Sequence, residues 1–216
     1  MSENMEIKIT FIGDLMCQLP QIQASRREVG YDFGAVFNKV SFLFQRSNYV
    51  IGNLETPIAG HALGLTSTPT NFNAPIEFAQ AAQNAGLGFF SIANNHCLDR
   101  GTEGLFNTID NLKKLEVDFS GGYKTSAESQ MPFVKSINGL RIAVLAFTYG
   151  TNSEWLDNGS DEKNKDCVDL FRKQDDFLAP AEGHFTSILK PIKKWRRTIF
   201  LNTSGRKSSP LSLKIA

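Results

Sequence analysis

The sequence predicts an α/β fold in which a mainly parallel sheet carries helices on its faces. Apolar runs rich in β-branched residues alternate with amphipathic stretches from residue 7 to residue 150, and this alternation is typical of parallel strands joined by crossover helices. Two later apolar runs are separated by Asn138-Gly139, a strong signal for a tight hairpin. We therefore expect a parallel sheet followed by one antiparallel hairpin near 132–148.

The individual elements follow from local patterns. Strand-like runs occur at 7–13, 48–55 and 87–94. A short segment at 117–122 precedes the two hairpin runs, at 132–137 and 140–148. Helical spacing of apolar residues predicts helices over 35–47, 74–86 and 102–116. The first places Val36, Val40, Leu43 and Phe44 at that spacing, the second has Pro near its start and Gly just past its end, and the third puts Leu105, Ile109 and Leu112 on one face.

Composition points to a globular protein without a polyanion-binding role. The net charge is +1, which argues against nucleic acid as a partner. The amino terminus lacks the pattern of a signal peptide and no run is long enough to cross a bilayer, so we expect a cytoplasmic protein. Three well-separated cysteines, Cys17, Cys97 and Cys167, predict free thiols.

The carboxyl-terminal part differs in composition from the rest of the chain. Residues 185–216 contain eight Lys and Arg and no Asp or Glu. We therefore expect a domain at 1–165 and an atypical basic tail at 166–216. Our hypothesis for the tail is a truncated or frame-shifted product that ends in unrelated residues; the alternative is a basic surface for phosphate or acidic lipid.

Polar residues follow each of the first three strand-like runs. Asp14 follows 7–13, Glu55 closes 48–55, and Asn95 follows 87–94 within the segment ANNHCLDRG at 93–101. Taken singly, each is typical of an ordinary turn, but the carboxyl ends of parallel strands meet at one edge of a sheet. Two carboxylates there repel each other unless a cation lies between them. Oxygen ligands beside an imidazole suit Mn²⁺ or Mg²⁺, with Zn²⁺ or Fe as alternatives.

His96 and Asp99 form a second pair in the same segment. If the segment begins a helical turn, both side chains project to one side, and the carboxylate orients the ring and raises its basicity. Such a histidine can donate a proton to a leaving group or stabilise charge on a phosphoryl oxygen. The alternative is that Asp99 caps a helix beginning near Thr102.

Four motifs in order carry a family resemblance: GDLM, NLETPI, ANNHCLDRG and GLFNTIDNL. Over residues 7–152 the chain resembles the capsule-biosynthesis proteins of the poly-γ-glutamate type, a branch of the calcineurin-like metallophosphoesterase superfamily. The resemblance implies a metallophosphoesterase-like layered sandwich with a metal site at the strand ends. It also implies that Asp14 and Asn95 are metal ligands, that Glu55 bridges metals, and that His96 is a phosphate-contacting acid.

The chain departs from the family pattern in its second half. Members carry two further motifs, of the His-Trp-Gly and Gly-His-His-Pro-His kind, and the chain has neither. We therefore expect the carboxyl-terminal half of the fold to be incomplete. The expected function is capsule or poly-γ-glutamate biosynthesis with a metallophosphatase-type site. The alternatives are a metal-dependent phosphoesterase and a catalytically dead scaffold. Expected partners are polyglutamate or a small phosphate-containing substrate, and membrane-bound capsule-synthesis proteins.

Overall fold

The computed structural model describes residues 6–68, 70–129, 131–152 and 167–170, and they form the α/β fold that the sequence predicts. The strands are β1 (Ile9–Asp14), β2 (Tyr49–Asn53), β3 (Phe89–Ser91), β4 (Asp118–Ser120), β5 (Phe133–Ile137) and β6 (Leu140–Val144). The helices are α1 (Leu19–Ser25), α2 (Gly34–Phe37), α3 (Ser41–Phe44), α4 (Ile76–Asn84), α5 (Gly101–Lys114) and α6 (Ser126–Ser129), with a 3₁₀ turn, η1, at His61–Leu63.

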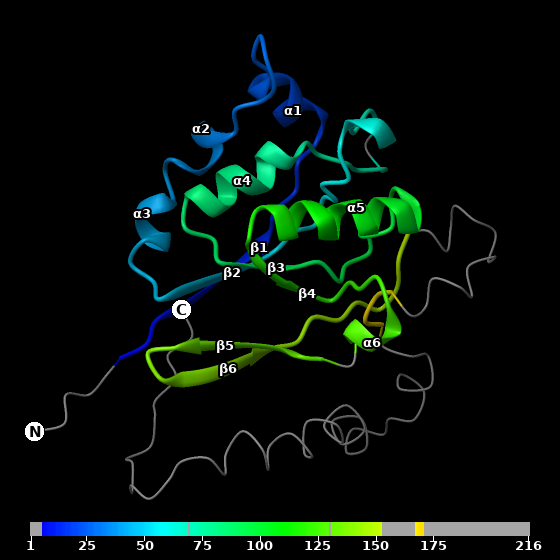
Figure 1. Cartoon of the computed structure of the whole chain (residues 1–216). Coiled ribbons are helices and arrows are strands. Elements are labelled where there is room, and N and C mark those ends of the chain that lie inside the picture. The colour runs from blue at the N-terminus through cyan, green and yellow to red at the C-terminus, as the bar shows by residue number, and fades with distance from the viewer. Residues whose placement is uncertain (1–5, 69, 130, 153–166, 171–216) are drawn as a thin grey trace, which may run out of the picture. The chain divides into compact units, whose positions relative to one another are not determined.

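Strands β1 to β4 form one parallel sheet in the order β1-β2-β3-β4. Helices α4 and α5 cover one face of this sheet, and the β5–β6 hairpin covers the other (Figure 1). Because the strands are parallel, their carboxyl-terminal ends all lie along the same edge of the sheet. The loops at 14–18, 54–60 and 92–100 leave from this edge. This edge is where ligands gather in open parallel sheets.

Two apolar clusters hold these layers together. The larger lies between the helices and the sheet and includes Phe33, Phe90 and the α5 residues Leu105, Ile109 and Leu112, all nearly inaccessible to solvent. The predicted apolar face of 102–116 is thus confirmed. A smaller cluster on the opposite face joins Tyr49, Ile51 and Phe89 of the sheet to Ile137 of the hairpin.

The hairpin has the turn that its sequence predicts. Asn138 and Gly139 both adopt positive φ, 47° and 82°, which matches the two-residue turn that Asn-Gly favours. The ring of Phe133 in β5 lies 5.0 Å from that of Phe89 in β3. This contact fixes the hairpin on the sheet.

The predicted helix over 35–47 is wrong in its extent, because the segment forms two short helices, α2 and α3, separated by a turn. Val36, Val40 and Leu43 are exposed, whereas Phe37 and Phe44 are buried. The β-branched valines and the intervening Asn38 are poor helix formers. Each short helix therefore buries one phenylalanine, and the segment does not form the continuous apolar face that the sequence predicts.

Residues 167–170 pack against this same unit. Val168 forms a bridge with Gly122, Leu170 forms one with Thr148, and Cys167 and Val168 are buried. The predicted boundary between 165 and 166 and the basic composition of 185–216 lie outside the described residues. Within the described ranges, every helix is too short or too polar to span a bilayer.

Candidate functional site

The ends of neighbouring strands bring the predicted residues to one edge of the sheet. Asp14 at the end of β1 is the register partner of Asn53 at the end of β2, and Asn53 is the partner of Ser91 at the end of β3. The loop that follows β3 carries Asn95, His96 and Asp99. Parallel pairing therefore places residues from three separate parts of the sequence at one edge.

The side chain of Asn53 connects the polar residues at this edge through hydrogen bonds. Its side-chain Nδ2 donates to Asp14 Oδ1 at 2.8 Å and to Glu55 Oε2 at 2.6 Å. Its Oδ1 accepts a hydrogen bond from Asn94 Nδ2 at 3.1 Å. One carboxamide thus lies between two carboxylates, in the place where the sequence predicts a cation.

Glu55 is a buried carboxyl group at this site. Its side chain is 9% exposed. Burial raises the pKa of this carboxyl, the hydrogen bond from Asn53 opposes that effect, and the nearby charge of Asp14 raises the pKa further. A buried carboxylate in this setting is stabilised by a proton, by donors such as the Asn53 amide, or by a cation.

His96 lies between two carboxylates. Its Nδ1 is 2.8 Å from Asp99 Oδ2 and its Nε2 is 4.0 Å from Glu55 Oε1. The ring of Phe72 packs against the imidazole, with 4.5 Å between ring centroids. The predicted pairing of His96 with Asp99 is therefore present. The other ring nitrogen, Nε2, faces Glu55, so it lies on the side of the two strand-end carboxylates, Asp14 and Glu55, which we call the carboxylate edge.

Asp99 does not cap the following helix. Its side chain is fully buried, and Oδ2 also accepts a hydrogen bond from the backbone N–H of Phe72 at 2.7 Å. The N-cap of α5 is Arg100, and no side chain caps the helix there. The contacts of Asp99 instead tie the 92–100 loop to the segment around Phe72 and orient the His96 ring.

Asn95 is exposed and faces a different partner. Its Nδ2 donates to Asn152 Oδ1 at 3.3 Å, and its backbone carbonyl accepts from the Asn152 N–H at 2.7 Å. Among the predicted ligands, Asp14 and Glu55 are thus joined through Asn53, whereas Asn95 is held by Asn152. The sequence contains a signal for Asn53, which ends a strand beside Glu55, but Asn152 has no local pattern that marks it.

The oxygen atoms at this edge are of the type that binds a hard divalent cation. Because Asp14 and Glu55 both accept from Nδ2 of Asn53, their oxygens are no farther apart than the summed lengths of those two hydrogen bonds, 2.8 and 2.6 Å. One cation with metal–oxygen distances of about 2.0–2.6 Å bridges a similar span. Across residues 6–68, 70–129, 131–152 and 167–170, no group of three His, Cys, Asp or Glu side chains is placed to hold an ion. The described part therefore supplies two carboxylates and neighbouring amide oxygens.

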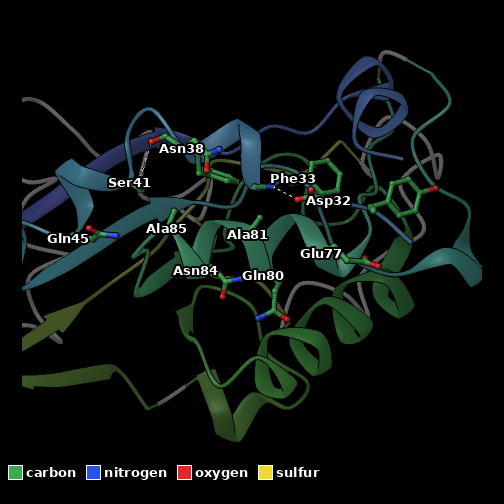
Figure 2. A pocket seen from close by; sticks show the side chains of 13 residues that line it. Asp32, Phe33, Asn38, Ser41, Gln45, Glu77, Gln80, Ala81, Asn84 and Ala85 are labelled. Carbon is green, nitrogen blue, oxygen red and sulfur yellow. Dashed lines mark hydrogen bonds between the residues drawn. The ribbon is translucent and has the colours of Figure 1, made fainter. Parts of the chain in front are cut away.

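A cavity lies away from the strand-end site, between the α2–α3 segment and α4 (Figure 2). This cavity of about 330 Å³ has a mixed lining of carboxamides, aromatic rings, small residues and the carboxylates of Asp32 and Glu77, and no His or Cys of the described residues lines it. Asp32 at its rim pairs with Arg27 at 3.3 Å. It offers no acid–base pair comparable to His96 and Asp99, so the strand-end site is the better candidate for chemistry.

Comparison with known proteins finds a family match and similar curated proteins. Residues 8–199 match the family described as "Bacterial capsule synthesis protein PGA_cap". The chain is 29% identical over 155 residues to the "Capsule biosynthesis protein CapA" of Bacillus anthracis. The matched region covers 68% of this chain and 36% of that protein. It is 26% identical over 144 residues to the "PGA biosynthesis protein CapA" of Bacillus subtilis (strain 168), covering 66% and 37%. The chain therefore spans just over a third of the length of these curated relatives.

Proposed function

The chain belongs to the family of bacterial capsule synthesis proteins, and from that premise we propose that its strand-end site assists phosphoester chemistry in capsule biosynthesis with a divalent cation. One observation carries the proposal: the carboxylates of Asp14 and Glu55 lie so close together that both accept a hydrogen bond from the same atom, Nδ2 of Asn53. Two acidic groups converge on one edge beside a histidine that has its own carboxylate partner. This combination of groups is typical of a metal-assisted hydrolytic site.

Asp14 and Glu55 are the proposed ligands for the cation, with Asn95 as a third oxygen donor. Carboxylate and amide oxygens favour Mn²⁺ or Mg²⁺, with Zn²⁺ or Fe as alternatives. When bound, the ion supplies charge neutralisation at a phosphoryl oxygen. Glu55 is buried, so its negative charge is unfavourable, and a bound cation would offset that cost.

His96 is the proposed acid. Asp99 holds the ring through Nδ1, and Nε2 faces the carboxylate edge, 4.0 Å from Glu55 Oε1. A proton on Nε2 is placed to stabilise charge on a phosphoryl oxygen or to protonate a leaving-group oxygen. The Phe72 ring covers one side of the imidazole and shields it from water.

The names of the relatives support a substrate class. They refer to capsule and PGA biosynthesis. On this basis we propose polyglutamate as a ligand. The proposed phosphoester chemistry calls instead for a small phosphate-containing molecule as the substrate, and the family resemblance suggests membrane-bound capsule-synthesis proteins as partners. The polar, strand-end position of the site suits a charged substrate, because such a ligand keeps part of its hydration.

A non-catalytic scaffold is the second candidate function. It is favoured by the small number of acidic and imidazole groups that converge within the described ranges. A hydrolytic centre with two metals needs more ligands than two carboxylates and an amide. The two candidates differ in whether the protein turns over a phosphate ester.

The test combines cation binding with hydrolysis of a generic aryl phosphate in the presence of Mn²⁺. We expect Mn²⁺-dependent turnover that falls by about 10²–10⁴-fold in His96→Ala, the range for loss of a general acid. Glu55→Gln is expected to weaken Mn²⁺ binding measured by calorimetry. Asn38→Ala, an exposed amide in the cavity of Figure 2, is the control and is expected to change neither quantity.

The outcomes separate the two candidates. Mn²⁺ binding without turnover in the unaltered protein supports the scaffold and rejects the phosphoesterase. Absence of Mn²⁺ binding, with equal stability in buffer and in chelator, rejects the metal site itself.

A further inference from the structure

We propose that Asn152 is a positioning residue whose carboxamide couples the tautomer of His96 to the orientation of Asn95. Asn152 lies 56 residues beyond His96, yet its Nδ2 is 3.0 Å from His96 Nδ1. Its Oδ1 accepts from Asn95 Nδ2 at 3.3 Å. A single side chain therefore contacts two adjacent residues of the site with opposite ends of one amide.

Asp99 and Asn152 make opposite demands on the same ring nitrogen. Asp99 Oδ2, 2.8 Å from Nδ1, is an acceptor when ionised and favours a proton on that nitrogen. The NH₂ group of Asn152 is a donor and favours a lone pair there. A neutral imidazole has one proton, so Nδ1 cannot satisfy both neighbours at once. Asn152 therefore shifts the proton toward Nε2, the nitrogen that faces Glu55.

The Asn152 amide also determines which atom of Asn95 is available. While Asn152 Oδ1 accepts from Asn95 Nδ2, the Oδ1 of Asn95 has no hydrogen-bond partner among the described residues. If the Asn152 amide turns by 180°, its oxygen accepts from a protonated Nδ1 and its NH₂ faces Asn95. Asn95 must then turn as well and use its oxygen, which leaves its NH₂ free.

The two arrangements have different chemical capacities. Only an oxygen of Asn95 can bind a cation, since an amide NH₂ cannot. The arrangement that leaves this oxygen free is also the one that places the His96 proton on Nε2. Asn152 thus links a ligand atom to the position of a proton. The consequence for catalysis rests on the proposed function, whereas the contacts themselves do not.

The tautomer of His96 is measured by long-range ¹H–¹⁵N NMR of the full chain labelled at histidine, at a fixed pH where the imidazole is neutral. The chain has three histidines, and His96→Gln assigns the signals. In Asn152→Ala only the preference of Asp99 remains, so the ratio of Nε2–H to Nδ1–H is expected to fall by about two- to tenfold, the effect of one hydrogen bond. Asn152→Asp, which presents two acceptors, is expected to give the lowest ratio.

The isosteric Asn152→Asp variant guards against misfolding. The backbone bond from Asn152 N–H to the Asn95 carbonyl does not depend on the side chain, and the aspartate keeps an acceptor for Asn95 Nδ2. Exchange of the Asn95 side-chain NH₂ is therefore expected to accelerate in Asn152→Ala and to stay slow in Asn152→Asp. Asn38→Ala is the control, with both quantities unchanged.

Equal tautomer ratios in the unaltered protein and in both Asn152 variants would overturn the inference, whatever the turnover. A changed ratio in a protein that does not bind Mn²⁺ supports the positioning role and rejects the metal site. Failure of the inference and failure of the proposed function thus give different results.

Discussion

At the scale of single residues, the carboxylate edge depends on one neutral side chain. Asn53 donates to Asp14 and Glu55 and accepts from Asn94. Because Glu55 is buried, its ionised form needs this donor more than the exposed Asp14 does. The hydrogen bond from Asn53 lowers the pKa of Glu55, but burial outweighs it and the pKa stays above its usual value.

Replacing Asn53 is therefore expected to destabilise the protein. Asn53→Ala removes the donor shared by two carboxylates, and we expect a loss of about 1–3 kcal/mol in the free energy of unfolding, the cost of an unsatisfied buried polar group. Urea denaturation measures this value. Asn48→Ala is the matched control, because the Asn48 side chain makes one exposed hydrogen bond, accepting from the Lys8 N–H at 2.8 Å. Equal losses in the two variants would contradict the central role of Asn53.

At the scale of elements, the β5–β6 hairpin depends on its turn and on its contact with the sheet. Five residue pairs are in antiparallel register around Asn138 and Gly139. Ile137 and Phe133 close the smaller apolar cluster over Phe89. Turn chemistry sets the register, and the register decides which hairpin side chains face the sheet.

A single methyl group at the turn tests this dependence. Gly139 has φ of +82°, and no atom lies within 4 Å of an added Cβ. Gly139→Ala is thus expected to lose about 1–2 kcal/mol of stability from backbone strain alone. Gly13→Ala is the control, since Gly13 has equal space and no positive φ. Thermal or urea unfolding compares the two, and similar stabilities would show that the turn conformation carries no strain.

At the scale of the whole described unit, residues 167–170 connect the end of β4 to the segment after β6. Tyr123 N–H donates to the Cys167 carbonyl at 2.7 Å, and Thr148 N–H donates to the Asp169 carbonyl at 3.0 Å. The hydroxyl of Tyr123 donates to Asp169 Oδ2 at 2.6 Å. These bonds join parts of the chain that the local sequence pattern does not relate to one another.

Asp169 gives the unit a pH-dependent stability. Burial raises the pKa of this carboxyl above its usual 3.8, and the Tyr123 hydrogen bond opposes the shift. The unfolded chain therefore releases this proton at lower pH than the folded protein does. The contribution to stability is fully present below about pH 3.8 and declines as the pH rises through the higher folded value.

Two variants check the sign of this effect. Asp169→Asn cannot titrate, so its stability is expected to vary less with pH across the window above 3.8. Tyr123→Phe removes the bond that lowers the pKa of Asp169, so the decline is expected to extend to higher pH. Urea denaturation at a series of pH values measures both profiles. A profile of Asp169→Asn that parallels the unaltered protein would contradict the assignment.

Much of the fold follows from short-range patterns. Strands β1 to β3, helices α4 and α5 and the hairpin lie where their periodicity and turn residues predict. Asp14 and Glu55 could be placed at one edge because parallel strands end on the same side. The pairing of His96 with Asp99 is likewise a matter of three residues of spacing. Each of these follows from a local pattern or from the general rule that parallel strands end on the same side of a sheet.

Tertiary structure decided what depends on distant partners. The segment at 35–47 contains weak helix formers and breaks into α2 and α3, which bury Phe37 and Phe44 against the rest of the protein, a contact that the local pattern does not contain. Asn53 becomes a bridge only when β1 and β2 align, and Asn152 reaches Asn95 across 57 residues of chain. The periodicity of apolar residues indicates which side of a helix or strand is buried. It does not indicate which distant residues meet, because a hydrogen bond such as that between Asn95 and Asn152 forms only when the chain between them is folded.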